Sequence, residues 1–128
     1  MVPQKASFPP KTFLNILLAI LSYSSAISLL YFVENESNLV FKIIGAFVFS
    51  FFGNTIFSLL HESVHGSFSW NKKINHFFGR ISAAFFPTSF TMQKHCHLGH
   101  HRRNRTDVEM FDMYYPTDNK FMKRLQLY

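Results

Sequence analysis

The sequence has little cysteine and little acidic charge. Its single cysteine, Cys96, excludes an internal disulfide. Seven acidic residues stand against 13 lysines and arginines, a formal net charge of +6, and ten of those basic residues follow Glu62. A basic flank is typical of nucleic-acid binding or of a segment beside a membrane. Hydrophobic residues make up 48% of the chain and are concentrated in long runs, which favours the membrane and argues against a nucleic-acid partner.

The first hydrophobic run predicts a transmembrane helix over residues 13–32. Residues 1–12 are polar, contain three prolines and form the N-terminal lead. The run that follows has no formal charge, and 20 residues at about 1.5 Å each cross about 30 Å, one hydrocarbon thickness. A cleaved signal peptide is the alternative, but a soluble chain should follow one, and here a second hydrophobic run follows.

The second run predicts a transmembrane helix over residues 39–60. Its one charge, Lys42, lies near the start, where its ammonium can reach the interface. Lys5 and Lys11 precede the first run, the basic stretch follows the second, and the turn between them is acidic. The positive-inside rule therefore predicts a multi-pass integral membrane protein, a two-span helical hairpin with both termini cytoplasmic.

Two further helices are expected after the hairpin, which makes the fold class all-α integral membrane. In the first, an apolar stripe at helical spacing lies opposite basic residues; the stripe is Ile74, Phe77, Phe78, Ile81 and Phe85, and the other side carries Lys72, Lys73, His76 and Arg80. This pattern predicts an interfacial amphipathic helix with its apolar side in lipid, the alternative being a core-facing helix of a soluble domain. A cytosolic helix should then carry His97 to Arg105.

Six of the seven histidines lie in two clusters. His61 and His65 are four residues apart on one helix face, so both imidazoles can reach one metal ion. The alternative for such a pair is a polar helix end, where imidazoles meet water. Asn54 and Ser58 continue the same stripe and are candidates to support the ligands; ordinary packing by small polar residues explains them equally well.

In the second cluster, His97, His100 and His101 fall within an arc of about 100° on a helix. His95 lies roughly opposite and would be an extra ligand only if the helix began later. Asp107 shares the His100 face if the helix persists, and metal-bound imidazole commonly donates its other N–H to a carboxylate. Imidazoles without thiolate suit iron, zinc or copper. Two metals need more than these five ligands, so the set is incomplete.

These motifs resemble those of the integral-membrane fatty acid desaturases. The similarity covers roughly residues 39–112 and rests on His61-Glu62-Ser63-Val64-His65-Gly66-Ser67, on Asn75 and Gly79, and on His97-Leu98-Gly99-His100-His101. The first box is HxxxH and the second HxxHH. Residues 66–96 separate them, a spacing similar to that family, whereas related hydroxylases tend to have a wider first box and a shorter gap.

The resemblance implies a membrane-bound non-haem di-iron enzyme that uses O2 to introduce a double bond into an acyl chain. Two iron ions would lie at the cytoplasmic face, within the histidine-box region 61–112. The implied ligands are His61, His65, His97, His100 and His101. The implied partners are an acyl-chain lipid substrate, O2, membrane lipids and an electron donor of the ferredoxin or cytochrome b5 type. A hydroxylase or ketolase outcome stays open.

The family pattern has a third box, HxxHH, after another pair of spans. Residues 113–128 contain no histidine and are expected to be an incomplete C-terminal end. The chain is therefore expected to be a fragment, a truncated form or one piece of a split enzyme.

Three rival functions are weighed against the desaturase. Residues 61–65 also read HExxH, so Glu62 could be the general base of an intramembrane zinc metalloprotease. That enzyme needs a distant aspartate in a later span and has no use for His97, His100 and His101. A carboxylate di-iron bundle would need a second Glu-x-x-His motif, which is absent. The third rival is a non-catalytic membrane remnant.

Overall fold

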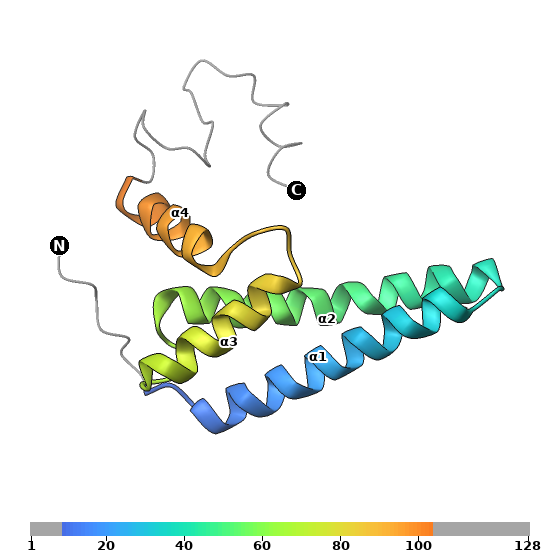
Figure 1. Cartoon of the computed structure of the whole chain (residues 1–128), viewed down its shortest axis with the longest axis horizontal. Coiled ribbons are helices and arrows are strands. Elements are labelled where there is room, and N and C mark those ends of the chain that lie inside the picture. The colour runs from blue at the N-terminus through green and yellow to red at the C-terminus, as the bar shows by residue number, and fades with distance from the viewer. Residues whose placement is uncertain (1–8, 104–128) are drawn as a thin grey trace, which may run out of the picture. The chain divides into compact units, whose positions relative to one another are not determined.

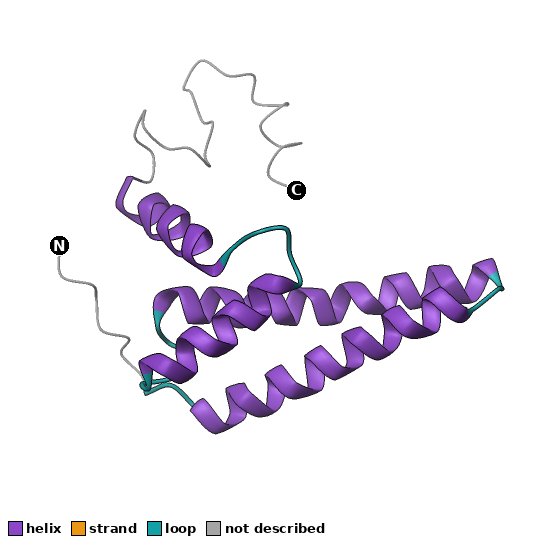
Figure 2. Ribbon diagram, viewed as in Figure 1, coloured by secondary structure: helices purple, strands orange, loops and turns teal. Residues whose placement is uncertain are grey.

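The computed structural model describes residues 9–103, and all regular structure in that range is helical (Figures 1 and 2). There are four helices in this range: α1 Thr12–Asn35, α2 Leu39–His65, α3 Lys72–Ala84 and α4 Phe90–Arg103. The all-α prediction is confirmed. The chain divides into two compact units, Met1–Lys94 and His95–Tyr128, so the first turn of α4 belongs to the first unit and its histidines to the second.

Helices α1 and α2 form a hairpin whose arms run side by side in opposite directions (Figure 1). In the described residues, these two helices are long and apolar enough to cross a membrane, as predicted. Both extend beyond the predicted runs 13–32 and 39–60. Helix α2 passes through the first histidine box and ends at Gly66, which has the left-handed conformation common after a helix end.

The hairpin exposes large apolar side chains along both arms. Ile27 is 59% exposed on α1, and Phe47 and Phe51 are 66% and 61% exposed on α2. Such a surface is costly in water because its apolar area stays hydrated. Hydrocarbon tails solvate it without that cost, and helices satisfy their own backbone groups there.

Helix α3 packs on the hairpin through a small core and several polar contacts. Ala19, Leu59 and Phe68 form the core, with Ile74 and Phe78 of α3 packed against it. Tyr23 of α1 joins its hydroxyl to Ser82 Oγ at 2.7 Å. These contacts attach α3 to both arms of the hairpin.

The apolar stripe predicted for α3 is divided between two environments. Ile74 and Phe78 turn inward to the core, whereas Phe77 stays 59% exposed. The buried residues of α3 are small or polar: Asn75, Gly79, Ser82 and Ala83. Ile74 and Phe78 are only partly buried. The expectation that the whole stripe faces lipid is therefore wrong for Ile74 and Phe78, because the core offers these side chains a closer apolar partner.

Helix α4 begins at Phe90, seven residues before His97. Ser89 precedes the helix, and its hydroxyl accepts a hydrogen bond from the Met92 amide at 3.1 Å. This bond satisfies an N–H that would lack a helical partner in the first turn. The predicted end of this helix at Arg105 lies outside the described residues.

Candidate metal centre

The first histidine pair occupies the last turn of α2. His61 and His65 lie one above the other, with ring centroids 4.6 Å apart. One ring nitrogen of each lies within 4.8 Å of the other, close enough to ligate one ion. The i,i+4 spacing predicted from the sequence is therefore realised in a single helix.

A glycine ends α2 directly after the pair. Gly66 has φ 77°, in the left-handed region that favours glycine. Its N–H donates to the Ser63 carbonyl at 3.1 Å, and the Ser67 N–H donates to the Glu62 carbonyl at 2.9 Å. These two bonds form a Schellman motif, which satisfies the last helical carbonyls. The helix end, and with it the position of His65, is thereby defined.

The side of this turn opposite the histidines is buried. Leu60, Ser63 and Val64 are all 2% exposed or less, whereas the side chain of His61 is 41% exposed. Burial of that side fixes the rotation of α2 about its axis. The imidazoles consequently project away from the core.

Glu62 lies beside the first pair. Its Oε1 is 3.9 Å from His61 Nδ1, an electrostatic contact longer than a hydrogen bond. A carboxylate at this place can help to orient a metal-bound imidazole. The sequence motifs assign Glu62 only the role of a protease base or of a ligand in a carboxylate bundle, although its position next to His61 also indicates a role beside that ligand.

The second pair lies on α4. His97 Nε2 and His101 Nε2 are 2.9 Å apart, and the ring centroids are 4.6 Å apart. The His100 ring is adjacent, with its centroid 5.6 Å from that of His101 and 6.2 Å from that of His97. The three histidines predicted to share a face are thus neighbours, and His97 and His101 are the closest two.

The remaining predicted residues lie as follows. His95 is exposed on α4, and the condition for its being a ligand, a later helix start, is not met because the helix begins at Phe90. Asn54 and Ser58 are exposed on α2, and the Ser58 hydroxyl donates to the Asn54 carbonyl at 3.0 Å. Asp107 lies outside the described residues. Supporting roles for these residues stay predictions.

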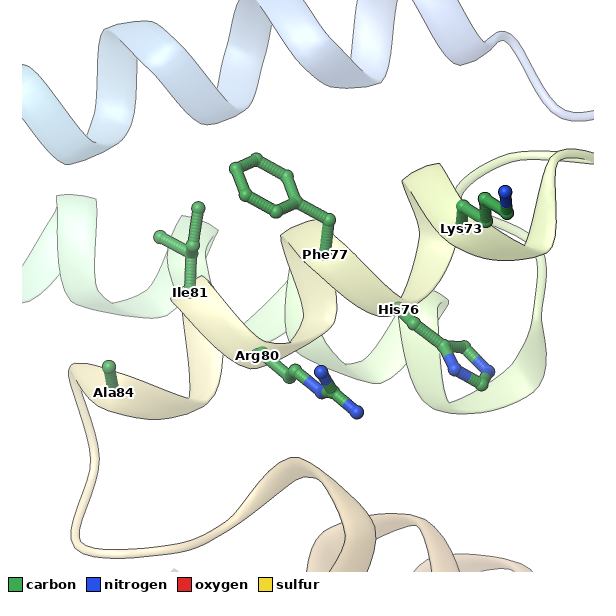
Figure 3. Close-up of a pocket in the computed structure, with 6 residues that line it drawn as sticks. All are labelled: Lys73, His76, Phe77, Arg80, Ile81 and Ala84. Carbon is green, nitrogen blue, oxygen red and sulfur yellow. The ribbon is translucent and has the colours of Figure 1, made fainter.

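A shallow pocket of about 550 Å³ lies elsewhere, on α3, and is open on one side (Figure 3). In Figure 3, His76 and Arg80 point to one side of the helix, and Phe77 and Ile81 point to the other. His76 also packs its ring edge-on against Phe90, with centroids 5.5 Å apart. His76 therefore has a packing partner that is not a histidine.

The model of the family described as fatty acid desaturase matches residues 37–128, more than half of the chain. The chain belongs to the fatty acid desaturase family. The matched region contains both histidine pairs. Comparison with curated proteins and comparison with solved structures each found no match.

Desaturase membership, together with the two apolar helices, indicates a membrane protein with oxidoreductase character. The donor set fits the metal that such enzymes use. Both pairs offer imidazole nitrogen alone, and imidazole suits iron as well as zinc and copper.

Proposed function

We propose that the chain is the histidine-box portion of a membrane-bound non-haem di-iron desaturase acting on acyl-chain lipids. The observation that carries the proposal is the presence of two i,i+4 histidine pairs, each with its nitrogens close together, inside the region that matches the desaturase family. The proposed ligands of two iron ions are His61, His65, His97, His100 and His101. When bound, iron supplies the activation of O2 needed to attack an unactivated C–H bond.

The residues of this chain would prepare the site in three ways. The buried side of α2 directs His61 and His65 outward, and Gly66 fixes where their helix ends. Glu62 stands close enough to His61 to orient its ring. The exposed apolar surface of α1 and α2 keeps the site at a membrane, where acyl lipids are concentrated. O2 and an electron donor of the ferredoxin or cytochrome b5 type complete the proposal.

Metal content tests this function directly. The full chain, expressed in iron-replete cells without added zinc and extracted from membranes, should co-purify with iron. Zinc at one equivalent with no iron would instead support the HExxH metalloprotease. Retention of neither metal would support a non-catalytic remnant, because an incomplete site binds metal poorly.

Product analysis then identifies the reaction. Membranes that contain the chain, an electron donor and O2 should yield acyl chains that have lost two hydrogens, detected by mass spectrometry of the released fatty acids. A gain of oxygen would indicate a hydroxylase or ketolase outcome. The donor is varied between ferredoxin and cytochrome b5 types in matched reactions.

We also propose that both termini are cytoplasmic and that α3 lies at the interface. The exposed Phe77 and the basic side of α3 support the second point, because lipid tails and anionic headgroups accept these groups respectively. Cys96, the single cysteine, provides a native label. A membrane-impermeant maleimide should reach it only from the cytoplasmic side.

The control for this labelling is Ser37→Cys in a Cys96→Ser background. Ser37 lies exposed in the turn between α1 and α2. It should react from the opposite side, and labelling of both sites from one side would contradict the hairpin.

A further inference from the structure

One buried residue of α3 contacts the turn that carries the first histidine pair. Asn75 is 4% exposed, and its Nδ2 donates to the carbonyl oxygen of Ser63 at 2.8 Å. Ser63 lies between His61 and His65 and is itself fully buried. Because a carbonyl can only accept, the amide must present its nitrogen to Ser63.

The Ser63 carbonyl is the point at which two restraints meet. It accepts from the Gly66 N–H of the Schellman motif as well as from Asn75. A peptide held from inside the helix and from a neighbouring helix has little freedom to rotate. Water does not compete for the bond between Asn75 and Ser63, since both residues are buried.

The oxygen of the same amide is not satisfied by a hydrogen bond within the described part of the chain. Asn75 Oδ1 is buried and has no hydrogen-bond partner among the described residues. An unsatisfied buried acceptor costs free energy, because it loses its hydrogen bonds to water and gains none in the protein. A residue kept only to fill space would be better replaced by an apolar one, so the amide must serve through its donor.

We infer that Asn75 is a positioning residue for metal binding. It fixes the Ser63 peptide and thereby holds His61 and His65 in the orientation in which they take the metal. The metal in this inference rests on the proposed function, whereas the hydrogen bond between Asn75 and Ser63 is independent of it. Asn75 touches neither histidine through this bond and acts only through the backbone between them.

Ser82 provides a matched control on the same buried face of α3. It is fully buried, and its Oγ forms a part-buried hydrogen bond with the Tyr23 hydroxyl at 2.7 Å. Its partner belongs to α1 and not to the histidine turn. Ser82→Ala therefore removes one tertiary hydrogen bond of α3 without touching Ser63.

The first measurement needs no metal. Hydrogen exchange of the Gly66 and Ser67 amides is followed by NMR in the full chain in detergent micelles. Asn75→Ala should speed exchange at these two amides about three- to tenfold relative to Ser82→Ala, as loss of one hydrogen bond predicts. Equal exchange in the two variants would overturn the inference.

The second measurement is titration with Co2+, whose visible absorption reports coordination. Asn75→Ala should weaken Co2+ affinity about tenfold, the size expected for groups that orient ligands. Ser82→Ala should change it less than about twofold, as expected for a site that shares no partner with the ligands. Unchanged affinity in Asn75→Ala despite faster exchange would also overturn the inference.

Asn75→Leu tests whether the effects of Asn75→Ala come from a folding defect. Leucine branches at the same carbon, fills the space that alanine leaves and removes the unsatisfied oxygen, but it cannot donate. It should keep the thermal stability of the parent and still show the faster exchange and weaker Co2+ binding. Absence of Co2+ binding by the parent chain would refute the proposed function and the metal role of Asn75, while the exchange result would still decide the Ser63 contact.

Discussion

The two histidine pairs have the same spacing but different surroundings. His61 and His65 end a 27-residue apolar helix, on a turn with a buried side, a Schellman motif and the Asn75 bond. His97 and His101 lie on a 14-residue helix in which, among the residues of described burial, Phe90 is the buried one. The first pair therefore lies on a turn restrained by tertiary contacts, whereas the second lies on a helix whose side chains are mostly exposed or half-buried. Metal binding should do more to order the second pair than the first.

The largest effect should come from removing a ligand. His61→Ala and His97→Ala should each weaken iron retention by more than about 100-fold, beyond the range seen when only groups around a ligand change. His76→Ala should leave iron retention unchanged, since His76 is not among the histidines whose ring nitrogens lie close together. Iron per protein after desalting checks this. An equal loss in all three variants would mean that the pairs are not the site.

Metal should protect the second pair more strongly than the first. At Fe2+ about ten times above its Kd, amide exchange over residues 97–101 should slow by about tenfold, because the bound form is stabilised by mass action. Slowing should be smaller at Gly66 and Ser67, whose amides are already hydrogen-bonded in the Schellman motif. Hydrogen exchange with and without metal measures both regions, and a reversed order would contradict the comparison. A chelator should restore the metal-free pattern.

Replacing Gly66, which follows α2, and Gly53, within α2, should change thermal stability in opposite directions. Gly66→Ala places a β-carbon in the left-handed conformation, which costs about 1–2 kcal/mol, and thermal unfolding in detergent should occur at a lower temperature. Gly53 is helical, and an added β-carbon there meets no atom within 4 Å. Gly53→Ala should therefore stabilise the helix by up to about 1 kcal/mol. Destabilisation by both would show that the end of α2 is not specially constrained.

An effect as small as that of Gly53→Ala is expected at Gly99, between the histidines of the second pair. It is helical, and an added β-carbon there meets no atom within 4 Å. A β-carbon added at Gly79 would lie 2.5 Å from the Phe90 ring, which is a steric clash. Gly99→Ala should stabilise α4 by up to about 1 kcal/mol and raise metal affinity slightly. Helicity by circular dichroism and Fe2+ titration check it, with Gly79→Ala as the destabilising counterpart. Weaker metal binding in Gly99→Ala would show that α4 must flex to bind.

Local pattern was enough to predict the elements and the pairing of the histidines. The two apolar helices follow from uninterrupted hydrophobic runs, and the approach of His61 to His65 and of His97 to His101 follows from 3.6 residues per turn. Neither conclusion requires knowledge of which helices meet. The motifs also led to the correct family, because ligand type and spacing are properties of the chain itself.

Tertiary packing decided what surrounds those histidines. Periodicity placed Ile74, Phe77 and Phe78 on one stripe, but only the core formed with Ala19 and Leu59 determined which of them turn inward. Asn75 was visible as part of a motif, yet its bond to Ser63 depends on α3 folding back onto the end of α2. Hydrogen bonds between residues far apart in sequence depend on the relative placement of helices, and no local spacing encodes that placement.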